Sequence, residues 1–200
     1  TDRSQYPVSV PVNAVGRVAI HRARLYLGLR LDSRTIRARD KLEVEIRAVD
    51  WIGNPVSNQT VEALLAKRTW YRTGTQEAGW AYTDTLVSEL EVTTDALGQA
   101  ETLFNPPRPG HYVVKVGSRD RRGRLAESEG DLWVSGDELV DWRLESDAVT
   151  PILDSKTYAV GETARIMVPT TFTGTYQLLL TVERGRLMHV ERLTLDTPNP

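Results

Sequence analysis

One segment of the chain occurs twice. The stretch LDSRTIRARDKLEVEI, from Leu31 to Ile46, aligns without gaps with LDSKTYAVGETARIMV, from Leu153 to Val168, and the two copies begin 122 positions apart. The apolar positions correspond in order, with Leu42, Val44 and Ile46 in the first copy and Ala164, Ile166 and Val168 in the second. Duplication of a supersecondary pattern indicates two related modules in tandem, each about 120 residues long. The alignment also predicts that Gly161 occupies the turn that Arg39 occupies in the first copy.

The first copy contains the clearest periodicity in the chain. Leu42, Val44, Ile46 and Ala48 alternate with charged residues, which predicts a β-strand with one buried and one solvated face. Other short runs rich in β-branched and aromatic residues predict further strands. These runs are Arg17–Leu31, with a bulge at Gly28, then Thr60–Tyr71, Ala78–Tyr82, Leu86–Thr93, Ala100–Phe104, Tyr112–Val116, Leu125–Val134, Thr163–Val168, Tyr176–Glu183 and Leu187–Leu195, with a turn at Thr173-Gly174.

Three turns between the expected strands share the pattern D-x-x-G. They lie at Asp50–Gly53, Asp95–Gly98 and Asp120–Gly123. An Asp at the first turn position accepts a backbone N–H two residues on, and a Gly at the fourth adopts positive φ without steric cost. We therefore interpret them as hairpin turns between antiparallel strands. Calcium binding is disfavoured because single carboxylates separated by whole strands do not form the dense oxygen shell that calcium needs.

A proline-rich corner precedes one of the expected strands. Pro106-Pro107-Arg108-Pro109-Gly110 cannot sit inside a sheet, and Tyr112 follows it closely. A buried tyrosine at this point, with its hydroxyl bonded to nearby backbone, resembles the tyrosine corner of immunoglobulin-like sandwiches. Together with the turns, this predicts an all-β fold of tandem antiparallel β-sandwiches, fibronectin-like or immunoglobulin-like.

The two copies divide the chain unevenly. Residues 1–16 carry two prolines around alternating valines and are expected to form a linker or the tail of a preceding module. The first module is then expected over 17–136 and a second, incomplete one over 137–200. A half-sandwich exposes strand edges, so we expect it to pair with the first module, a neighbouring chain or residues 1–16. Leu178, Leu180 and Val182 should face a core supplied from outside 184–200.

Charge and composition give no sign of a nucleic-acid or membrane partner. The formal net charge is −2, so no global field draws the chain to polyanions, and the basic run at 119–124 is expected to be a solvated hairpin turn. No apolar stretch approaches the ~20 residues needed to cross a bilayer, and we expect no direct membrane insertion. The lack of cysteine excludes disulfides, thiolate metal sites and a cysteine nucleophile.

No residue pattern indicates catalysis. His21, His111 and His189 lie far apart and outside metal-ligand spacings, so they are expected to be surface strand residues, with His111 pointing away from the core. Nucleophile-elbow and phosphate-loop motifs are missing. We therefore predict a protein that is not an enzyme, with no catalytic, cofactor-binding or metal-binding residues and no cofactor. Asn58-Gln59-Thr60 fits the glycosylation sequon, a short pattern that is frequent by chance.

Four aromatic residues stand out on two adjacent expected strands. They are Trp70, Tyr71, Trp80 and Tyr82. Core and cross-strand packing is one interpretation, and a stacking platform for sugars or a partner surface is the other.

Several motifs occur in a fixed order along the chain. Tyr158-Ala-Val-Gly161-Glu-Thr-Ala164 has the form Y-x-x-G-D/E-x-A, and Leu179-Leu-Thr-Val-Glu183-Arg has the form L-x-T-V-E-R. Upstream lie Val49–Val56, Thr94–Gly98 and Gly110–Tyr112. In this order the series resembles the macroglobulin modules of the alpha-2-macroglobulin family, particularly its bacterial branch, over most of the chain.

The resemblance implies a scaffold fragment of a broad-spectrum endopeptidase inhibitor, a protease trap in which cleavage of a bait segment triggers collapse around the protease. It implies neighbouring macroglobulin domains as partners, target proteases met through the full-length protein, and a periplasmic or extracellular location. The family's reactive thioester motif, C-x-E-Q, is missing from a chain without cysteine, and the bait segment is expected near or beyond the second module. Two alternatives stay open. They are a carbohydrate-binding or adhesin-type sandwich using Trp70, Trp80 and Tyr82, and an accessory domain of a secreted hydrolase.

Overall fold

The protein is built from β-strands. The computed structural model describes residues 15–16, 18, 20–74, 79–140, 142, 149–170, 172, 174–197 and 199. Every regular element in this part of the chain is a strand, which confirms the all-β prediction. None of these residues forms a helix long and apolar enough to cross a membrane.

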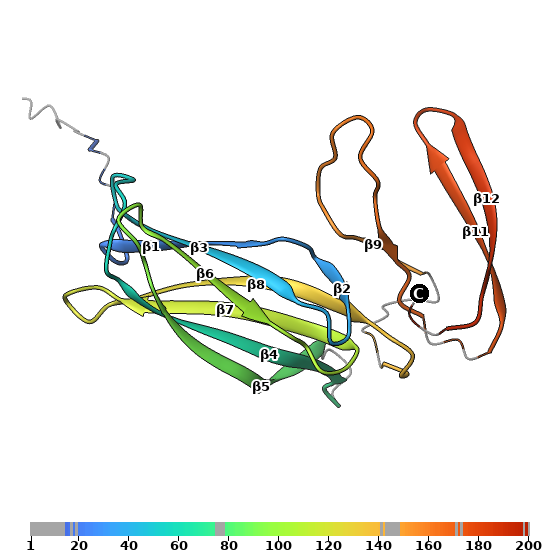
Figure 1. Cartoon of the computed structure of the whole chain (residues 1–200), viewed down its shortest axis with the longest axis horizontal. Coiled ribbons are helices and arrows are strands. Elements are labelled where there is room, and N and C mark those ends of the chain that lie inside the picture. The colour runs from blue at the N-terminus through green and yellow to red at the C-terminus, as the bar shows by residue number, and fades with distance from the viewer. Residues whose placement is uncertain are drawn as a thin grey trace, which may run out of the picture.

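Strands β1 to β8 form two sheets that pack face to face, and we call this unit the sandwich (Figure 1). The first sheet has the order β1-β3-β6, with β1 at Leu25–Leu31, β3 at Leu42–Asp50 and β6 at Gln99–Phe104. The second has the order β2-β8-β7-β4-β5, with β2 at Thr35–Arg37, β8 at Leu125–Ser135, β7 at Gly110–Arg119, β4 at Thr60–Arg72 and β5 at Trp80–Thr93.

The core lies between these sheets. Leu42, Val44 and Ile46 of β3 are buried, as their alternation predicted. They pack in one cluster with residues of both sheets: Val61, Ala63, Leu65, Phe104, Tyr112, Val114, Val116, Leu132 and Val134. Burying each large apolar side chain stabilises the fold by about 1.5–3 kcal/mol.

The three D-x-x-G turns have the predicted local geometry. In each, the Asp Oδ1 accepts the backbone N–H groups two and four residues on, over 2.8–3.0 Å. The glycine φ angles are +92°, +70° and +76°. The prediction that all three join paired strands is wrong for two of them. Only Asp120–Gly123 joins paired strands, β7 and β8, whereas the turns at Asp50 and Asp95 lead from one sheet to the other. Their chemistry reverses the chain locally, but the burial pattern of the following strand selects its sheet.

The predicted tyrosine corner is confirmed. Tyr112 is 1% exposed, and its hydroxyl donates to the Arg108 carbonyl over 2.8 Å. Burial raises the pKa of this phenol. The bond fixes the proline-rich corner to the start of β7.

Some strand details differ from the predictions. β1 begins at Leu25, and Gly28 pairs regularly with Arg47, so the bulge prediction is wrong, because a glycine inside an antiparallel pair does not by itself interrupt the ladder. The two runs expected over 78–82 and 86–93 are one strand, β5, whose register with β4 shifts near Leu65. β2 pairs parallel to β8, the exception in an otherwise antiparallel set.

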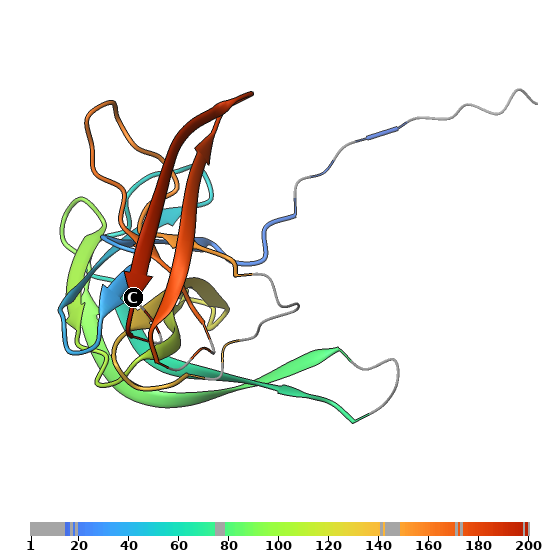
Figure 2. The same cartoon turned by 90° about the vertical axis from the view of Figure 1, so that its right-hand side faces the viewer.

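β4 and β5 extend beyond the rest of their sheet. β7 pairs with β4 only from Glu62 to Arg68, whereas β5 continues alongside β4 to the Arg72–Trp80 pair. We call residues 69–72 of β4 and 80–83 of β5 the arm. Figure 2 shows it projecting from the sandwich.

The repeated segment forms the same turn in both copies. In the first, Asp32 Oδ1 accepts the Glu43 N–H over 3.1 Å, and Ser33 Oγ donates to the Thr35 carbonyl over 2.7 Å. The second copy has the equivalent bonds, from the Arg165 N–H to Asp154 Oδ1 over 3.0 Å and from Ser155 Oγ to the Thr157 carbonyl over 2.9 Å.

Strand register and backbone conformation repeat as well. Leu31 lies opposite Val44, and its counterpart Leu153 lies opposite Ile166. Arg39 has φ +74° and Gly161 has φ +93°, which confirms that both occupy the same turn position. Arg39 is one of the few non-glycine residues held in this left-handed region.

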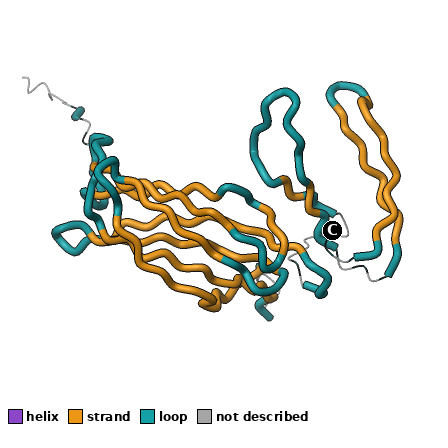
Figure 3. Tube along the Cα trace, viewed as in Figure 1, coloured by secondary structure: helices purple, strands orange, loops and turns teal. Residues whose placement is uncertain are grey.

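The second copy leads into a separate hairpin. β9 (Ile152–Leu153) pairs with β10 (Ile166–Met167), so the strand expected over 163–168 is shorter than predicted. β11 (Tyr176–Glu183) and β12 (Leu187–Leu195) have the predicted bounds and form a two-stranded sheet at one end of the sandwich (Figure 3).

The apolar face of this hairpin is only partly covered. Leu178 and Leu180 are half-buried, and Val182 is 51% exposed. The expected pairing with residues 1–16 falls almost entirely on residues outside the described part, as does Thr173 of the predicted turn. The module boundaries 1–16, 17–136 and 137–200 stay predictions.

Candidate functional site

A row of aromatic side chains crosses the outer face of the five-stranded sheet. In spatial order the row contains Tyr82 of β5, Trp70 of β4, His111 of β7 and Trp133 of β8. Cross-strand register places Tyr82 opposite Trp70 and His111 opposite Trp133. Successive ring centroids are 5.0, 6.2 and 5.0 Å apart. We call these four residues the aromatic row.

His111 is held from both sides. Its Nδ1 accepts the indole N–H of Trp70 over 3.1 Å, and its Nε2 lies 2.8 Å from Asp131 Oδ1. The first bond requires an unprotonated Nδ1, so the imidazole carries its proton on Nε2 and donates it to Asp131. This bond from His111 lowers the pKa of Asp131. The prediction that His111 points away from the core is correct, but its side chain is only 11% exposed.

Neighbouring rings of the row contact one another in different ways. His111 and Trp133 are stacked, with an interplanar angle of 6°, whereas Trp70 and His111 are nearly coplanar at 7° and meet edge to edge through their hydrogen bond. At the ends, the guanidinium of Arg68 lies 3.9 Å from the Tyr82 ring centroid and that of Arg34 lies 5.2 Å from the Trp133 centroid. Stacking on a sugar needs an uncovered ring face. Arg68 covers Tyr82, and Arg34 and His111 cover Trp133, so the geometry favours cross-strand packing over a carbohydrate platform.

All four predicted aromatic residues lie in the arm, and the two outside the aromatic row are Tyr71 and Trp80. Tyr71 is 49% exposed, and the Arg72 guanidinium lies 5.2 Å from the ring centroid of Trp80. The sequence reasoning missed His111 and Trp133 as members of the row. The available signal was that both fall on the polar side of strands whose other side is apolar.

A charge cluster lies beside the aromatic row. Arg68 Nε and Nη2 each donate to Asp84, to Oδ1 and Oδ2 respectively, over 2.8 Å, and Lys115 Nζ lies 2.7 Å from Asp84 Oδ2. The bond from Arg68 and then that from Lys115 lower the pKa of Asp84 to about 2 against the opposing effect of desolvation. At neutral pH this carboxylate is permanently ionised and fully bonded, so it is unsuited to general acid or base catalysis.

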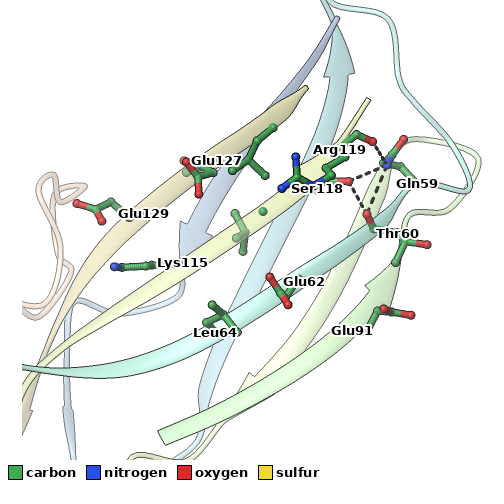
Figure 4. Close-up of a pocket in the computed structure, with 14 residues that line it drawn as sticks. Gln59, Thr60, Glu62, Leu64, Glu91, Lys115, Ser118, Arg119, Glu127 and Glu129 are labelled. Carbon is green, nitrogen blue, oxygen red and sulfur yellow. Dashed lines mark hydrogen bonds between the residues drawn. The ribbon is translucent and has the colours of Figure 1, made fainter. Parts of the chain in front are cut away.

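An open groove of about 750 Å³ follows the same sheet face (Figure 4). Its floor contains Gly117, which lies opposite Glu62 on one side and Glu127 on the other. Glu91 lies opposite Glu62, and at one end Gln59 Nε2 donates to Ser118 Oγ over 2.7 Å. These carboxylates are spread over three strands, so they give the groove an acidic character without converging on one point.

The two copies of the repeated turn touch each other. The Arg34 N–H donates to the Asp154 carbonyl over 2.9 Å. A second contact is made by Asn199, whose Nδ2 donates to the carbonyls of Gly136 (3.2 Å) and Glu138 (2.8 Å) while its Oδ1 accepts the Trp142 indole N–H. The Asn199 side chain is buried. We call these two contacts the joint.

The remaining predicted residues are dispersed. His21 is exposed, bonds the Tyr26 hydroxyl over 2.7 Å and lies 5.6 Å from the Trp51 ring, and His189 is exposed near Glu191. Arg119–Arg124 form the predicted turn, where the Arg24 and Arg124 groups lower the pKa of Asp120. Among the described residues, no group of three or more His, Cys, Asp or Glu side chains is placed to hold a metal ion.

Comparison with known proteins gives one curated relative. No protein-family model matches the chain. An alpha-2-macroglobulin homolog of Nostoc sp. (strain PCC 7120 / SAG 25.82 / UTEX 2576) is 31% identical over 83 residues, which make up 41% of this chain and 4% of the relative. The chain thus matches a small part of a much longer protein. The match confirms the resemblance to the alpha-2-macroglobulin family.

Several solved structures are also similar. Native E. coli alpha-2-macroglobulin aligns with a TM-score of 0.45 and 16% identity over 88% of this chain and 13% of that one. Salmonella alpha-2-macroglobulin reacted with methylamine gives a TM-score of 0.45 and 14% identity over 89% and 12%. Spo0M, a sporulation control protein from Bacillus subtilis, gives a TM-score of 0.42 and 10% identity over 86% of this chain and 90% of that one.

Proposed function

We propose that this chain, a relative of the alpha-2-macroglobulins, is a non-enzymatic scaffold segment of a larger protease-trapping inhibitor. The observation that carries the proposal is the repeated turn. The same hydrogen bonds, strand register and positive φ occur in both copies, and the copies meet at the joint. A scaffold of tandem modules needs repeated units of fixed shape and a defined contact between them.

The proposed modules are a linker or preceding tail at 1–16, a sandwich at 17–136 and an incomplete second unit at 137–200. In the second unit the hairpin β11–β12 leaves apolar residues exposed, among them Leu179, Val182 and Val190. A two-stranded hairpin is marginally stable alone. Neighbouring macroglobulin domains of the full-length protein would cover this face, and they are the direct partners that we assign to the segment.

The proposed mechanism is mechanical. The sandwich has a continuous core and keeps its shape, whereas the hydrogen bonds of the joint are few. Rigid-body transitions are transmitted where packed units meet through small interfaces. Cleavage of a bait segment elsewhere in the full-length protein would therefore shift the joint while the sandwich moves as one body. Target proteases are met through the whole protein, in the periplasm or outside the cell.

A distance measurement tests this mechanism. The chain has no cysteine of its own, so spin labels can be added at chosen sites in the full-length protein. One pair, Glu101→Cys with Glu191→Cys, spans the joint between two exposed strand positions. The control pair, Glu101→Cys with Glu62→Cys, lies within the sandwich. Protease treatment should change the first distance and leave the second unchanged, and a change in the control pair alone would contradict the proposal.

The isolated chain gives a simpler test. A scaffold segment on its own should leave general endopeptidases fully active on a protein substrate. Substantial inhibition at equimolar amounts would show that the segment inhibits by itself and would overturn the scaffold assignment.

A further inference from the structure

The bond between Trp70 and His111 connects the arm to the rest of the sheet. Pairing between β4 and β7 ends at Arg68 and His111, so the arm lies beyond the third strand. Trp70 is the arm residue whose indole N–H reaches back to His111 Nδ1 over 3.1 Å. The bond therefore joins the arm to β7 and, through Asp131, to β8.

This bond exists in only one protonation state of His111. An indole N–H is a donor only, and so is a protonated imidazole nitrogen. A proton on Nδ1 would face the Trp70 N–H across 3.1 Å, and the two donors would have to separate. The bond to Asp131 is kept when that proton is added, because Nε2 donates in both states.

The groups around His111 have opposing effects on an imidazolium. Asp131 and the ring of Trp133, both on β8, stabilise a positive charge at 2.8 Å and 5.0 Å. Arg68 on β4 and Arg34 before β2 are cations near Asp131. The charge of Arg68 is balanced by Asp84 on β5 over 2.8 Å. A protonated His111 would keep its contact with Asp131 and lose the bond to Trp70.

We propose that His111 is a proton-sensitive latch for the arm. In the neutral state Trp70 is bonded to Nδ1 and the arm is held against the sheet. Protonation of Nδ1 displaces the Trp70 N–H and turns the hydrogen bond with Asp131 into an ion pair, so the arm loses this bond to β7. Imidazole side chains change charge between roughly pH 5 and 8, so mild acidification would loosen the arm and expose Tyr82 and Tyr71 more fully.

The test follows the indole N–H signals of the intact chain by NMR. The chain has 5 tryptophans, and the Trp70 signal is identified by its loss in Trp70→Phe. The proposal predicts that the chemical shift of this signal changes between roughly pH 8 and 5, in step with the ring signals of His111. Over the same range, amide protection at 70–72 and 80–82 should fall after correction for the intrinsic exchange rate.

Two variants distinguish loss of the Trp70–His111 bond from a non-specific effect of low pH. His111→Gln should abolish the movement of the Trp70 signal and the loss of protection. His21→Gln, which removes a histidine near Trp51, should leave both intact. A Trp70 signal that stays constant while His111 titrates, or that moves equally in His111→Gln, would overturn the proposal.

A third variant keeps the test decisive if His111→Gln does not fold. Asp131→Asn still offers an oxygen to the Nε2–H but removes the negative charge. The midpoint of the Trp70 movement should shift to lower pH, because the carboxylate no longer stabilises the imidazolium. An unchanged midpoint would show that His111 is not the titrating group.

Discussion

Loss of the Asp84 carboxylate should leave the nearly buried guanidinium of Arg68 without its main ion-pair partner. The Arg68 side chain is 7% exposed and that of Asp84 is 15% exposed, and the two share a bidentate ion pair. Removing one partner of a buried pair costs about 3–5 kcal/mol. Arg68 retains the Tyr82 ring and a distant Glu129 contact at 3.8 Å. We therefore expect Asp84→Asn to lower the free energy of unfolding by about 3 kcal/mol.

The pKa of Asp84 gives a similar magnitude independently. Its value is lowered from 3.8 to about 2 in the folded chain, which corresponds to about 2 kcal/mol at neutral pH. Because the folded pKa lies below the unfolded one, this stabilisation is fully present above about pH 4 and is lost as pH falls through about 2. The stability difference between wild type and Asp84→Asn should shrink over that interval.

Urea unfolding followed by tryptophan fluorescence measures the effect, and the chain supplies a matched control. Arg30 and Glu45 form a similar bidentate pair, but their side chains are 71% and 49% exposed. Glu45→Gln should cost below about 1 kcal/mol. The double variant Arg68→Leu with Asp84→Leu should be more stable than Asp84→Asn, because no charge is left buried. The reasoning is refuted if Asp84→Asn costs no more than Glu45→Gln.

Three further predictions concern turns and the joint. A Cβ at Gly98 would lie 2.5 Å from a backbone oxygen, whereas a Cβ at Gly53 would meet nothing within 4 Å. In Gly53→Ala only the positive φ is strained. Gly98→Ala should therefore lower the free energy of unfolding in urea by at least about 2 kcal/mol more than Gly53→Ala. Tyr112→Phe removes the hydrogen bond of the tyrosine corner, which should lower the free energy of unfolding by about 1–2 kcal/mol and lower the thermal midpoint. An unchanged midpoint would argue against the corner. Asn199→Ala should speed proteolysis between the sandwich and the β11–β12 hairpin without changing the unfolding midpoint of the sandwich.

Contacts close in sequence were predictable. The repeated turn is held by bonds between residues at most 11 positions apart, such as Asp32 with Glu43, so the alignment alone placed Gly161 at the turn position of Arg39. The bounds of β11 and β12 and the hydroxyl bond of Tyr112 follow from similarly local patterns. In each case the residues that decide the geometry lie within one short stretch.

Contacts that depend on sheet order were not predictable. The aromatic row joins residues 70, 82, 111 and 133, and no spacing in the sequence relates them. Their proximity requires that β7 lie between β4 and β8, an arrangement set by which strands bury their apolar sides together. The same dependence explains the turns at Asp50 and Asp95, whose local signals were read correctly but whose following strands join the opposite sheet.

The two copies also differ in what stabilises the same turn. Ile36 in the first copy packs against the sandwich core and pairs with Val134. Its counterpart Tyr158 donates its hydroxyl to Asp154 Oδ1 over 2.6 Å and accepts the Ser155 N–H over 3.0 Å. The second turn thus replaces a distant hydrophobic contact with bonds inside its own loop. A turn that is stabilised by bonds within its own loop depends less on its neighbours for its shape, and the mechanism proposed above requires this property at the joint.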